Sequence, residues 1–430
     1  MSKLLVLSVD SLFDEDMDFL RTLPNFGRLL RSAAYSRDGM RSVYPSFTYP
    51  AHATIITGTY PITHGVYHNE LLDPGCKRTD WYWYHRYLKA ETVIDAAKRA
   101  GLVTAVVGWP CMAGCPNADY LVPEIWTGQA DEDPHAIFAT GASENIMRDG
   151  IFERHCHKLR GVHQPFLDEF MVSCACDVLR LHKPDVLFIH TTHLDHVRHH
   201  TGVHNSSVEQ AIIANDSWLG RLMEASQEAG TYDETNFVVV SDHGHMAVRQ
   251  IFNPNVVFSR EGLIETDGSG RLLSWQAWSN SCALSAQVVL KDPTDAALRE
   301  KVEKIIYAMR ARPECGVESV FTKEECAREW RVAGQFDYML EGRDGTGFWN
   351  AWTGPEIILP DNSDYKFSVA SHGHIPTKGP QPVFMMIGPN VREGTVISRR
   401  PLVDEAPTFA RMLGFDMPQA EGKPIMEMIK

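Results

Sequence analysis

Short apolar runs that alternate with longer helical segments constrain the fold of this chain most strongly. Runs rich in aliphatic residues stand at residues 4–8, 103–107, 186–189, 237–241 and 383–387. Segments with helical periodicity lie between or after them, at residues 23–33, 92–100, 165–181, 208–225 and 404–413. Apolar strands separated by helices are typical of βα units, in which helices cover both faces of a sheet. We therefore predict an α/β fold with a central, largely parallel sheet.

One long region departs from this alternation. Residues 246–370 contain a strand pattern at 286–290 and a helical pattern at 294–311, among segments rich in Gly, Pro and Asp that interrupt long elements. We predict a smaller inserted α+β subdomain there, with residues 1–245 and 371–430 forming the core. Residues 70–90 and 110–160 are rich in Trp, Tyr, Pro and Gly, and we expect them to form loops.

Composition limits the partners of this chain. Its 430 residues are 44% hydrophobic and 22% charged, which suits a large folded core. The formal net charge of −14 argues against a broad surface for nucleic-acid polymers or anionic membranes. We find no apolar stretch of about 18 residues that would span a bilayer. The sequence leaves the oligomeric state open.

The N-terminal residues and the cysteines bear on location. The first apolar run stops at Asp10 without a small-residue cleavage pattern, so we interpret it as a strand rather than a signal peptide. The nine cysteines are scattered and odd in number, which favours free thiols over a disulfide framework. We therefore expect a cytoplasmic protein.

Polar residues gather in four places, most of them just after the apolar runs. These are Asp10, the segment PSFTYPAHATIITG at 45–58, the segment HLDHVRHHTG at 193–202, and SDHGH at 241–245 together with SHGH at 371–374. Ligands of open α/β sheets bind beyond the carboxyl ends of the strands. Zinc accepts Asp and His ligands, and several of them converging is what a two-metal site requires. A single Asp after a strand also fits the cap of a helix, and a single His also fits a buried imidazole without a ligand. The prediction of a two-metal site therefore rests on the four clusters taken together.

The spacing within two of these segments suggests how ligands would be shared. Asp195 and His199 are four residues apart, so on a helix they project from one face and can hold one ion together. Asp242 and His243 are adjacent and would diverge in a strand. They can bind one metal where the turn curls around it, and a carboxylate that leans between two ions is the alternative.

Thr48 is the candidate nucleophile. A hydroxyl group is a weak nucleophile until a metal or a base activates it. Pro50 suits the first turn of a helix through AHATIIT, which would put Thr48 at the positive end of the helix dipole, where phosphate binds readily. Taken by itself, the segment fits an ordinary capping hydroxyl equally well.

The order Asp, hydroxyl residue, Asp-x-x-x-His, Asp-His-Gly, His-Gly resembles the alkaline phosphatase superfamily. The segment FTYPAHATIITGTYPITHGV is similar to the threonine nucleophile segment of the nucleotide pyrophosphatase/phosphodiesterase family. The resemblance to this family covers residues 1–250 and 365–415. It implies an alkaline-phosphatase-like core with two Zn²⁺ ions, although other divalent metals stay open. By the same resemblance, one zinc is held by Asp10, Thr48, Asp242 and His243, and the other by Asp195, His199 and His372. Asn69 would donate a hydrogen bond to a phosphate oxygen.

The sequence departs from the family pattern at positions that concern the substrate. Members that bind nucleotides usually stack the base on an aromatic residue five positions before the first aspartate of the Asp-x-x-x-His motif. Here that position is His190, which is a candidate contact to substrate. Arg198 replaces a usual glycine and is a candidate contact to substrate phosphate. Trp81 begins the run WYWY and either walls the leaving-group pocket or packs within the protein. Further imidazoles, including His193 and His245, are expected to support the ligands or to lie at the surface.

The resemblance implies hydrolysis of a phosphodiester or phosphoanhydride bond in a small phosphate ester or nucleotide, through a phosphothreonine intermediate. A phosphonoacetate-type phosphonate hydrolase is an alternative, for which Lys77, Arg78 and Arg86 would supply the cations that hold a carboxylate. The sequence also leaves open a phosphomutase of the same superfamily and a metal-stabilised binding protein without turnover. The segment lacks the Cys- or Ser-x-Pro-x-Arg pattern of sulfatases.

Overall fold

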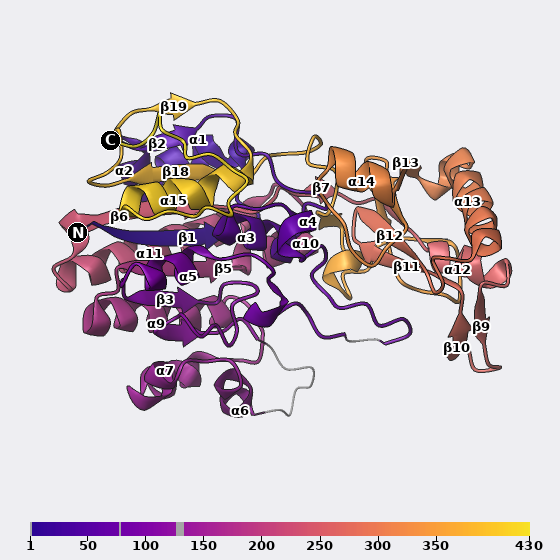
Figure 1. Cartoon of the computed structure of the whole chain (residues 1–430), viewed down its shortest axis with the longest axis horizontal. Helices are drawn as coiled ribbons and strands as arrows, with labels where there is room; N and C mark the ends of the chain where they lie inside the picture. Colours follow the sequence, from indigo (N-terminus) through magenta and orange to yellow (C-terminus); the bar gives the residue numbers. More distant parts are fainter. Residues whose placement is uncertain (1, 77–78, 126–132) are drawn as a thin grey trace.

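A twisted sheet forms the centre of the computed structural model, which describes residues 2–76, 79–125 and 133–430 (Figure 1). In this part of the chain the sheet has eight strands in the order β19-β2-β18-β6-β1-β5-β3-β4. Their bounds are β1 (Lys3–Val9), β2 (Ala34–Ser36), β3 (Thr104–Val107), β4 (Tyr120–Val122), β5 (Val186–Thr191), β6 (Thr235–Val240), β18 (Phe384–Ile387) and β19 (Val396–Ile397).

The middle of the sheet is parallel. β1 pairs in parallel with β5 and β6, and β3 pairs in parallel with β5 and β4, whereas β18 runs antiparallel to β6 and β2. The side chains of β1 alternate between two cores, because Leu5, Leu7 and Val9 face one cluster while Leu4 and Val6 face the other. The predicted α/β class with a largely parallel sheet is confirmed.

Helices cover both faces of this sheet. One face packs against α1 (Met17–Thr22), α2 (Pro24–Leu30), α9 (Phe166–His182) and α11 (Ser206–Glu228). The other face packs against α3 (Thr48–Thr57), α5 (Val93–Arg99) and α15 (Glu405–Leu413), while α4 (Pro61–His64) follows α3. None of the helices in the described ranges has the length and hydrophobicity to cross a membrane.

The prediction that residues 110–160 form loops is wrong over much of that range. Besides β4, the described part of this segment contains α6 (Pro134–Ala139), α7 (Glu144–Arg148) and α8 (Ile151–His155). Phe138, Ile146 and Phe152 are buried in the same core as α9. These helices are shorter than two turns, so their sequence shows too few apolar repeats for a helical period to be read.

The chain leaves the core after β7 (Met246–Ala247) and returns in β17 (Ala370–Ser371), and these two strands pair with each other. Between them lies an antiparallel sheet in the order β11-β12-β14-β13, with a second sheet β15-β8-β16 and a hairpin β9-β10. The bounds are β8 (Gln250–Phe252), β9 (Ile264–Thr266), β10 (Leu272–Trp275), β11 (Ala277–Cys282), β12 (Ser285–Leu290), β13 (Val317–Thr322), β14 (Tyr338–Gly342), β15 (Thr346–Phe348) and β16 (Ile357–Ile358). The helices are α12 (Pro254–Arg260), α13 (Ala296–Ala311) and α14 (Lys323–Glu329).

This arrangement supports the proposal that residues 246–370 form an inserted unit. The segment has its own buried cluster, which includes Val288, Val302 and Leu340. It also packs on the core, because Tyr44 and Tyr49 share a cluster with Phe336 and other residues of the insertion. In Figure 1 the insertion, coloured orange, lies at one end of the molecule beside α10 (His193–Thr201).

Candidate active site

One group of carboxylate and imidazole side chains converges at the carboxyl ends of β5, β6 and β17. Asp195 and His199 lie on one face of α10, as their spacing predicts, and His245 and His372 approach from the two other segments. The potential ligand atoms of these four residues all lie within 4.8 Å of one another. The His199 Nε2 atom is 3.3 Å from a carboxylate oxygen of Asp195.

Hydrogen bonds on the opposite side of each ring orient these imidazoles. Nδ1 of His199 lies 2.8 Å from the Ala370 carbonyl oxygen, and Nδ1 of His372 lies 3.2 Å from the Ser46 carbonyl oxygen. Nδ1 of His245 is 2.5 Å from the Ser11 hydroxyl. When a carbonyl oxygen accepts a hydrogen bond from Nδ1–H, the proton of the neutral ring stays on Nδ1, and Nε2 is free to bind a metal. The three Nε2 atoms therefore face Asp195 as potential ligands.

A second group stands directly beside the first. Asp10 follows β1 and Asp242 and His243 follow β6, and their potential ligand atoms also lie within 4.8 Å of one another. His243 Nε2 is 3.4 Å from Asp10 and 3.1 Å from Asp242. The rings of His243 and His372 stack with centroids 3.7 Å apart, which joins the two groups. The turn after β6 thus brings the adjacent Asp242 and His243 to one place.

Thr48 is the first residue of α3, and its hydroxyl lies 3.3 Å from Nε2 of His243. Phe47 occupies the N-cap position, and no side chain caps this helix end by a hydrogen bond. Thr48 is therefore not the capping residue of this helix. Its hydroxyl stands at the positive end of a ten-residue helix and points toward the second group.

The electrostatics of the site are those expected of a metal centre. Burial, together with the charges of Asp242 and Asp195, raises the pKa of Asp10 well above its usual value, and burial raises the pKa of Asp242 to about 7. Burial lowers the pKa of His372 to about 3 and that of His243 well below its usual value. Neutral imidazoles among closely spaced carboxylates are the ligand forms that divalent cations take.

Several of the buried ligand atoms also lack a hydrogen-bond partner within the described structure. They are Oδ1 of Asp10, Oδ1 of Asp195, Nε2 of His199, Oδ2 of Asp242 and Nε2 of His245. Buried polar atoms are almost always paired, so a set of unpaired acceptors aimed at common points is a specific sign of cation-binding sites. The residues present fit two divalent metal ions.

Both groups open on one cavity of about 270 Å³. Thr48, Asn69, Trp81 and Tyr365 contribute to its wall, together with Asp10, Glu124, Gln164, Asp195, His199 and His372. The Asn69 amide oxygen accepts a hydrogen bond from the Tyr49 backbone N–H at 2.9 Å, which turns the amide nitrogen the other way. Trp81 and Tyr365 have ring centroids 5.5 Å apart, so they form an aromatic wall.

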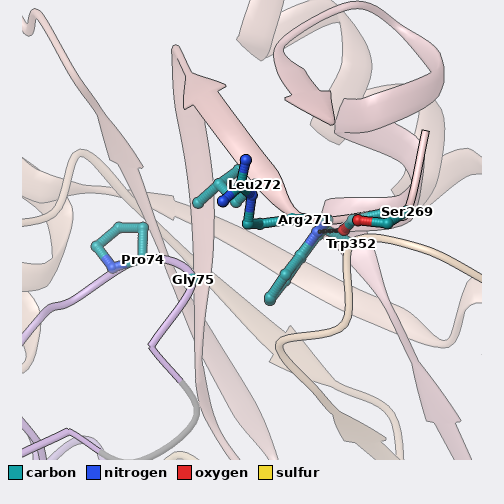
Figure 2. Close-up of a pocket in the computed structure, with 7 residues that line it drawn as sticks. Pro74, Gly75, Ser269, Arg271, Leu272 and Trp352 are labelled. Carbon is teal, nitrogen blue, oxygen red and sulfur yellow. Dashed lines mark hydrogen bonds between the residues drawn. The ribbon is translucent and has the colours of Figure 1, made fainter. Parts of the chain in front are cut away.

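Another hollow, of about 420 Å³, lies where the loop at Pro74 and Gly75 meets the β9-β10 hairpin of the insertion (Figure 2). Figure 2 shows Arg271 and Leu272 on its hairpin side, with Trp352 beside Ser269. The described lining contains no carboxylate, imidazole or thiol group. It therefore lacks the chemistry of the smaller cavity.

Two residues predicted to contact substrate are turned away from the cavity. Arg198 is fully buried, its guanidinium donates to both oxygens of Asp16, and it stacks 3.9 Å from the Phe13 ring. His190 is buried behind Asp10, with Nε2 3.2 Å from that carboxylate and Nδ1 3.1 Å from Glu124. Neither residue lines the cavity. The predictions for both are corrected: Arg198 serves an internal ion pair, and His190 orients Asp10.

Sequence reasoning also missed two members of the site. His245 lies among the ligand atoms of the Asp195 group rather than outside them, and its signal was its position two residues after His243 in SDHGH. Tyr365 comes from the irregular stretch LPDNSDYK of the insertion, where no pattern marks it. Its place in the wall depends on the return of the chain toward β17. Trp81 does line the cavity, as one of its two interpretations predicts.

The fold and the two groups define a class of proteins with a largely parallel α/β core and paired metal-type sites beyond the strand ends. A family model described as type I phosphodiesterase / nucleotide pyrophosphatase matches residues 4–373. The chain belongs to this family, which confirms the resemblance seen in the sequence.

Relatives of known function and solved structures agree with this membership. The chain is 25% identical over 236 residues to human ectonucleotide pyrophosphatase/phosphodiesterase family member 1, covering 52% of this chain and 21% of that protein. It is 22% identical over 424 residues to the Caenorhabditis elegans ectonucleotide pyrophosphatase/phosphodiesterase C27A7.1, covering 96% and 43%. The chain thus spans less than half the length of either relative. The structure of murine ectonucleotide pyrophosphatase/phosphodiesterase 5 has a TM-score of 0.70 at 16% identity, with full coverage of both chains, which shows a shared fold.

Proposed function

We propose that this chain hydrolyses a phosphodiester or phosphoanhydride bond in a small phosphate ester or nucleotide, with Thr48 as the nucleophile. The observation that carries the proposal is that Thr48 and members of both Asp/His groups line one cavity, namely Asp10 from one group and Asp195, His199 and His372 from the other. Family membership supports the reaction class, and an inactive variant of murine ectonucleotide pyrophosphatase/phosphodiesterase 5 has been solved in complex with AMP.

Two divalent cations, with zinc the first choice for Asp and His ligands, would supply positive charge to the transferring phosphoryl group and its leaving oxygen. In our assignment Asp10, Asp242, His243 and Thr48 hold one cation, and Asp195, His199 and His372 hold the other. The geometry adds His245 to the second set, since its Nε2 atom belongs to the same group.

The residues of this chain perform the remaining steps. The Thr48 oxygen bonds to phosphorus while the bond from phosphorus to the leaving alcohol or nucleotide oxygen breaks, and the Thr48 hydroxyl proton is released to water. The Asn69 amide nitrogen donates to a non-bridging oxygen. Water then cleaves the phosphothreonine ester and regenerates the hydroxyl. The aromatic wall of Trp81 and Tyr365 offers flat apolar surface to the leaving group.

The cavity favours this reaction over the phosphonate alternative. Its described lining has no Lys or Arg that would hold the carboxylate of a phosphonoacetate-type substrate. Arg86 stacks on Tyr84, 4.1 Å from the ring centroid, and Lys77 and Arg78 lie outside the described residues. A phosphomutase would keep the phosphoryl group in its product, so incorporation of oxygen from labelled water into released phosphate or phosphomonoester separates the two reactions.

The eight cysteines other than Cys76 are free thiols in the structure, which supports the proposal of a reducing compartment such as the cytoplasm. A fluorescent fusion of the full chain, imaged in its native host, tests that location.

The test of the reaction is Thr48→Ala assayed on bis(p-nitrophenyl) phosphate in the presence of zinc. We expect a loss of kcat of at least about 100-fold, because covalent catalysis needs the hydroxyl. Thr57→Ala is the control, since Thr57 lies on the same helix, its hydroxyl bonds to Ala53 and Thr59, and it does not line the cavity. Unchanged turnover in Thr48→Ala would exclude the assignment. Zinc-loaded wild-type protein that cleaves no phosphate ester would likewise contradict the proposed hydrolysis.

A further inference from the structure

A third group of potential metal ligands lies outside the active site. His85 begins the short helix His85–Tyr87, Asp95 lies in the first turn of α5, and Cys115 lies in the loop between β3 and β4. One nitrogen, one oxygen and one sulfur atom from these residues lie within 4.8 Å of one another. None of the three lines the catalytic cavity.

The local fold holds these three segments in place. The His85 backbone N–H donates to the Ala113 carbonyl at 3.0 Å, which ties the helix of His85 to the loop of Cys115. Asn117 of the same loop donates from its amide to Asp95 at 2.8 Å. Asp95 also accepts hydrogen bonds from the backbone and hydroxyl of Thr92, so its carboxylate is fixed at the start of α5. The three ligand atoms are thereby positioned before any ion binds.

We propose that His85, Asp95 and Cys115 bind a transition-metal cation, with Zn²⁺ the best match, in a structural site separate from the catalytic pair. Zinc accepts thiolate, imidazole and carboxylate ligands in one tetrahedral shell, and a thiolate favours zinc over magnesium or calcium. The thiol of Cys115 is 5% exposed and makes no disulfide, while the His85 side chain is 21% exposed. Water has access on the His85 side and supplies the fourth ligand.

Binding exchanges protons for the metal. Nε2 of His85 lies 3.2 Å from the Asp95 carboxylate, so any proton shared between them is released when the nitrogen takes the cation. The Cys115 thiol loses its proton in the same way, and no oxidant or reductant is needed. The ion would then join three segments, one of which continues from Trp81 in the wall of the catalytic cavity. The site would therefore stabilise that wall without contacting the substrate.

Cobalt substitution tests the proposal because only this group contains sulfur. The two catalytic groups consist of Asp and His alone, so a near-ultraviolet charge-transfer band from thiolate to Co²⁺ reports Cys115 specifically. The full chain is stripped with a chelator under reducing conditions and titrated with Co²⁺. We expect the band in the wild type and its loss in Cys115→Ser, with zinc content falling by one equivalent per chain.

Matched variants separate this site from the catalytic one. Cys176→Ser is the control, because Cys176 is a buried free thiol 3.7 Å from the Arg221 carbonyl and belongs to no ligand group. It should keep the band. Asp195→Asn should keep the band and lose activity, whereas Cys115→Ser and His85→Gln should lose the band and keep hydrolysis. A wild type that binds cobalt without the band, or a band unchanged in both His85→Gln and Cys115→Ser, overturns the proposal.

Discussion

His245 shows how one residue changes the interpretation of the metal site. The family resemblance assigns three protein ligands to the second zinc, yet Nε2 of His245 lies within the same group and 3.7 Å from Asp195. Ser11 occupies the other nitrogen of the ring. An imidazole held in this way either binds the cation directly or lies against its ligands.

Replacing His245 by Gln tests that role. We expect zinc affinity to fall by at least about 10-fold, because loss of a supporting group next to a metal typically costs 10- to 100-fold. Competition with a fluorescent zinc chelator measures the affinity. His204→Gln is the control, since His204 is exposed and pairs with Glu15 at the surface. Equal affinities in the two variants would mean that the Asp195 group functions without His245.

The corrections at Arg198 and His190 have a common physical cause. Sequence spacing gives the position of a residue along a helix or strand, but it does not say which other buried charge that residue meets. Asp16 pairs with Arg198, and Asp10 and Glu124 pair with His190, in each case from a segment distant in the sequence. A buried charge pairs with the nearest opposite charge, so neither side chain lines the cavity.

At the scale of elements, the tight approach at Gly373 joins the insertion to the metal site. Its φ of +89° lies in the left-handed region, and a Cβ atom there would lie 1.8 Å from the Cys282 carbonyl oxygen in β11. His372 and His374 flank Gly373 on either side. The Gly373 N–H also donates to the Ser46 carbonyl at 2.8 Å, two residues before Thr48.

Gly373→Ala should therefore disturb both stability and metal binding. Gly101→Ala is the matched control, because Gly101 has a φ of +81° but open space around its missing Cβ. Both variants carry the cost of a left-handed alanine, about 1–2 kcal/mol. We expect a larger loss of unfolding free energy in urea, and weaker zinc retention, only for Gly373→Ala. Equal losses of unfolding free energy in the two variants would show that the structure accommodates the added Cβ beside β11.

The packing of α4 against α3 predicts a dependence of stability on pH. Burial lowers the pKa of His64 to about 3. Nδ1 of His64 accepts from the Val66 N–H at 3.2 Å, so protonation would break this bond. Because the folded pKa lies below the unfolded value, the stabilisation is complete above about pH 6.5 and is lost as pH falls toward 3.

The measurement compares wild type with His64→Gln by urea unfolding at several pH values. The advantage of the wild type should shrink by up to about 1.4 kcal/mol per pH unit below pH 6.5. The free energy of unfolding of the exposed His204→Gln variant should change with pH in the same way as that of the wild type. A constant difference between wild type and His64→Gln would contradict the assigned direction of the pKa shift.

The elements that the sequence predicts well are those with enough length for a period to be read. The run at 4–8 is observed as β1, the pattern at 165–181 as α9 and the pattern at 208–225 within α11. The sequence did not predict the short strands β2, β4 and β19, which lie at or next to the edges of the sheet, or the helices α6 to α8. Their residues are set by contacts with distant elements, such as Met385 beside Tyr35, rather than by local repeats.

At the scale of the whole molecule, the two proposed metal-binding groups need the folded chain and would stabilise it when they bind cations. Asp10, Asp195 and Asp242 are carboxylates drawn from three segments, and several of their buried oxygens have no partner in the described structure. A cation that binds only the folded state raises the free energy of unfolding by about 2.7 kcal/mol at 100 times its Kd.

Chelation with EDTA should therefore lower the thermal midpoint, and added zinc should restore it. Asp195→Asn should show a smaller shift than the wild type, because the chain then loses fewer tightly bound ions. Differential scanning calorimetry with parallel metal analysis checks both statements. A midpoint that stays constant while the metal is demonstrably removed would argue that hydrogen bonds alone stabilise these carboxylates.

The sequence order of the motifs predicts most of the site because the parallel strands bring their carboxyl ends together. Asp10 after β1, Asp195 after β5 and Asp242 after β6 meet for this reason alone. The aromatic wall could not be found in this way, since Tyr365 approaches from the insertion. Its position follows from the course of 125 intervening residues, numbered 246–370, rather than from any local motif.

The pairing of Ala247 with Ala370 puts the exit and the return of the inserted chain next to each other. A replacement segment grafted between them has to bridge only two neighbouring strands, whatever its own length. Asp242, His243 and His245 precede this junction and His372 follows it, so these residues stay in the core, and the graft has to replace the contact of Cys282 with Gly373. If the proposed function holds, exchange of this one segment would change the wall that Tyr365 contributes, while the Asp and His groups would stay in the core.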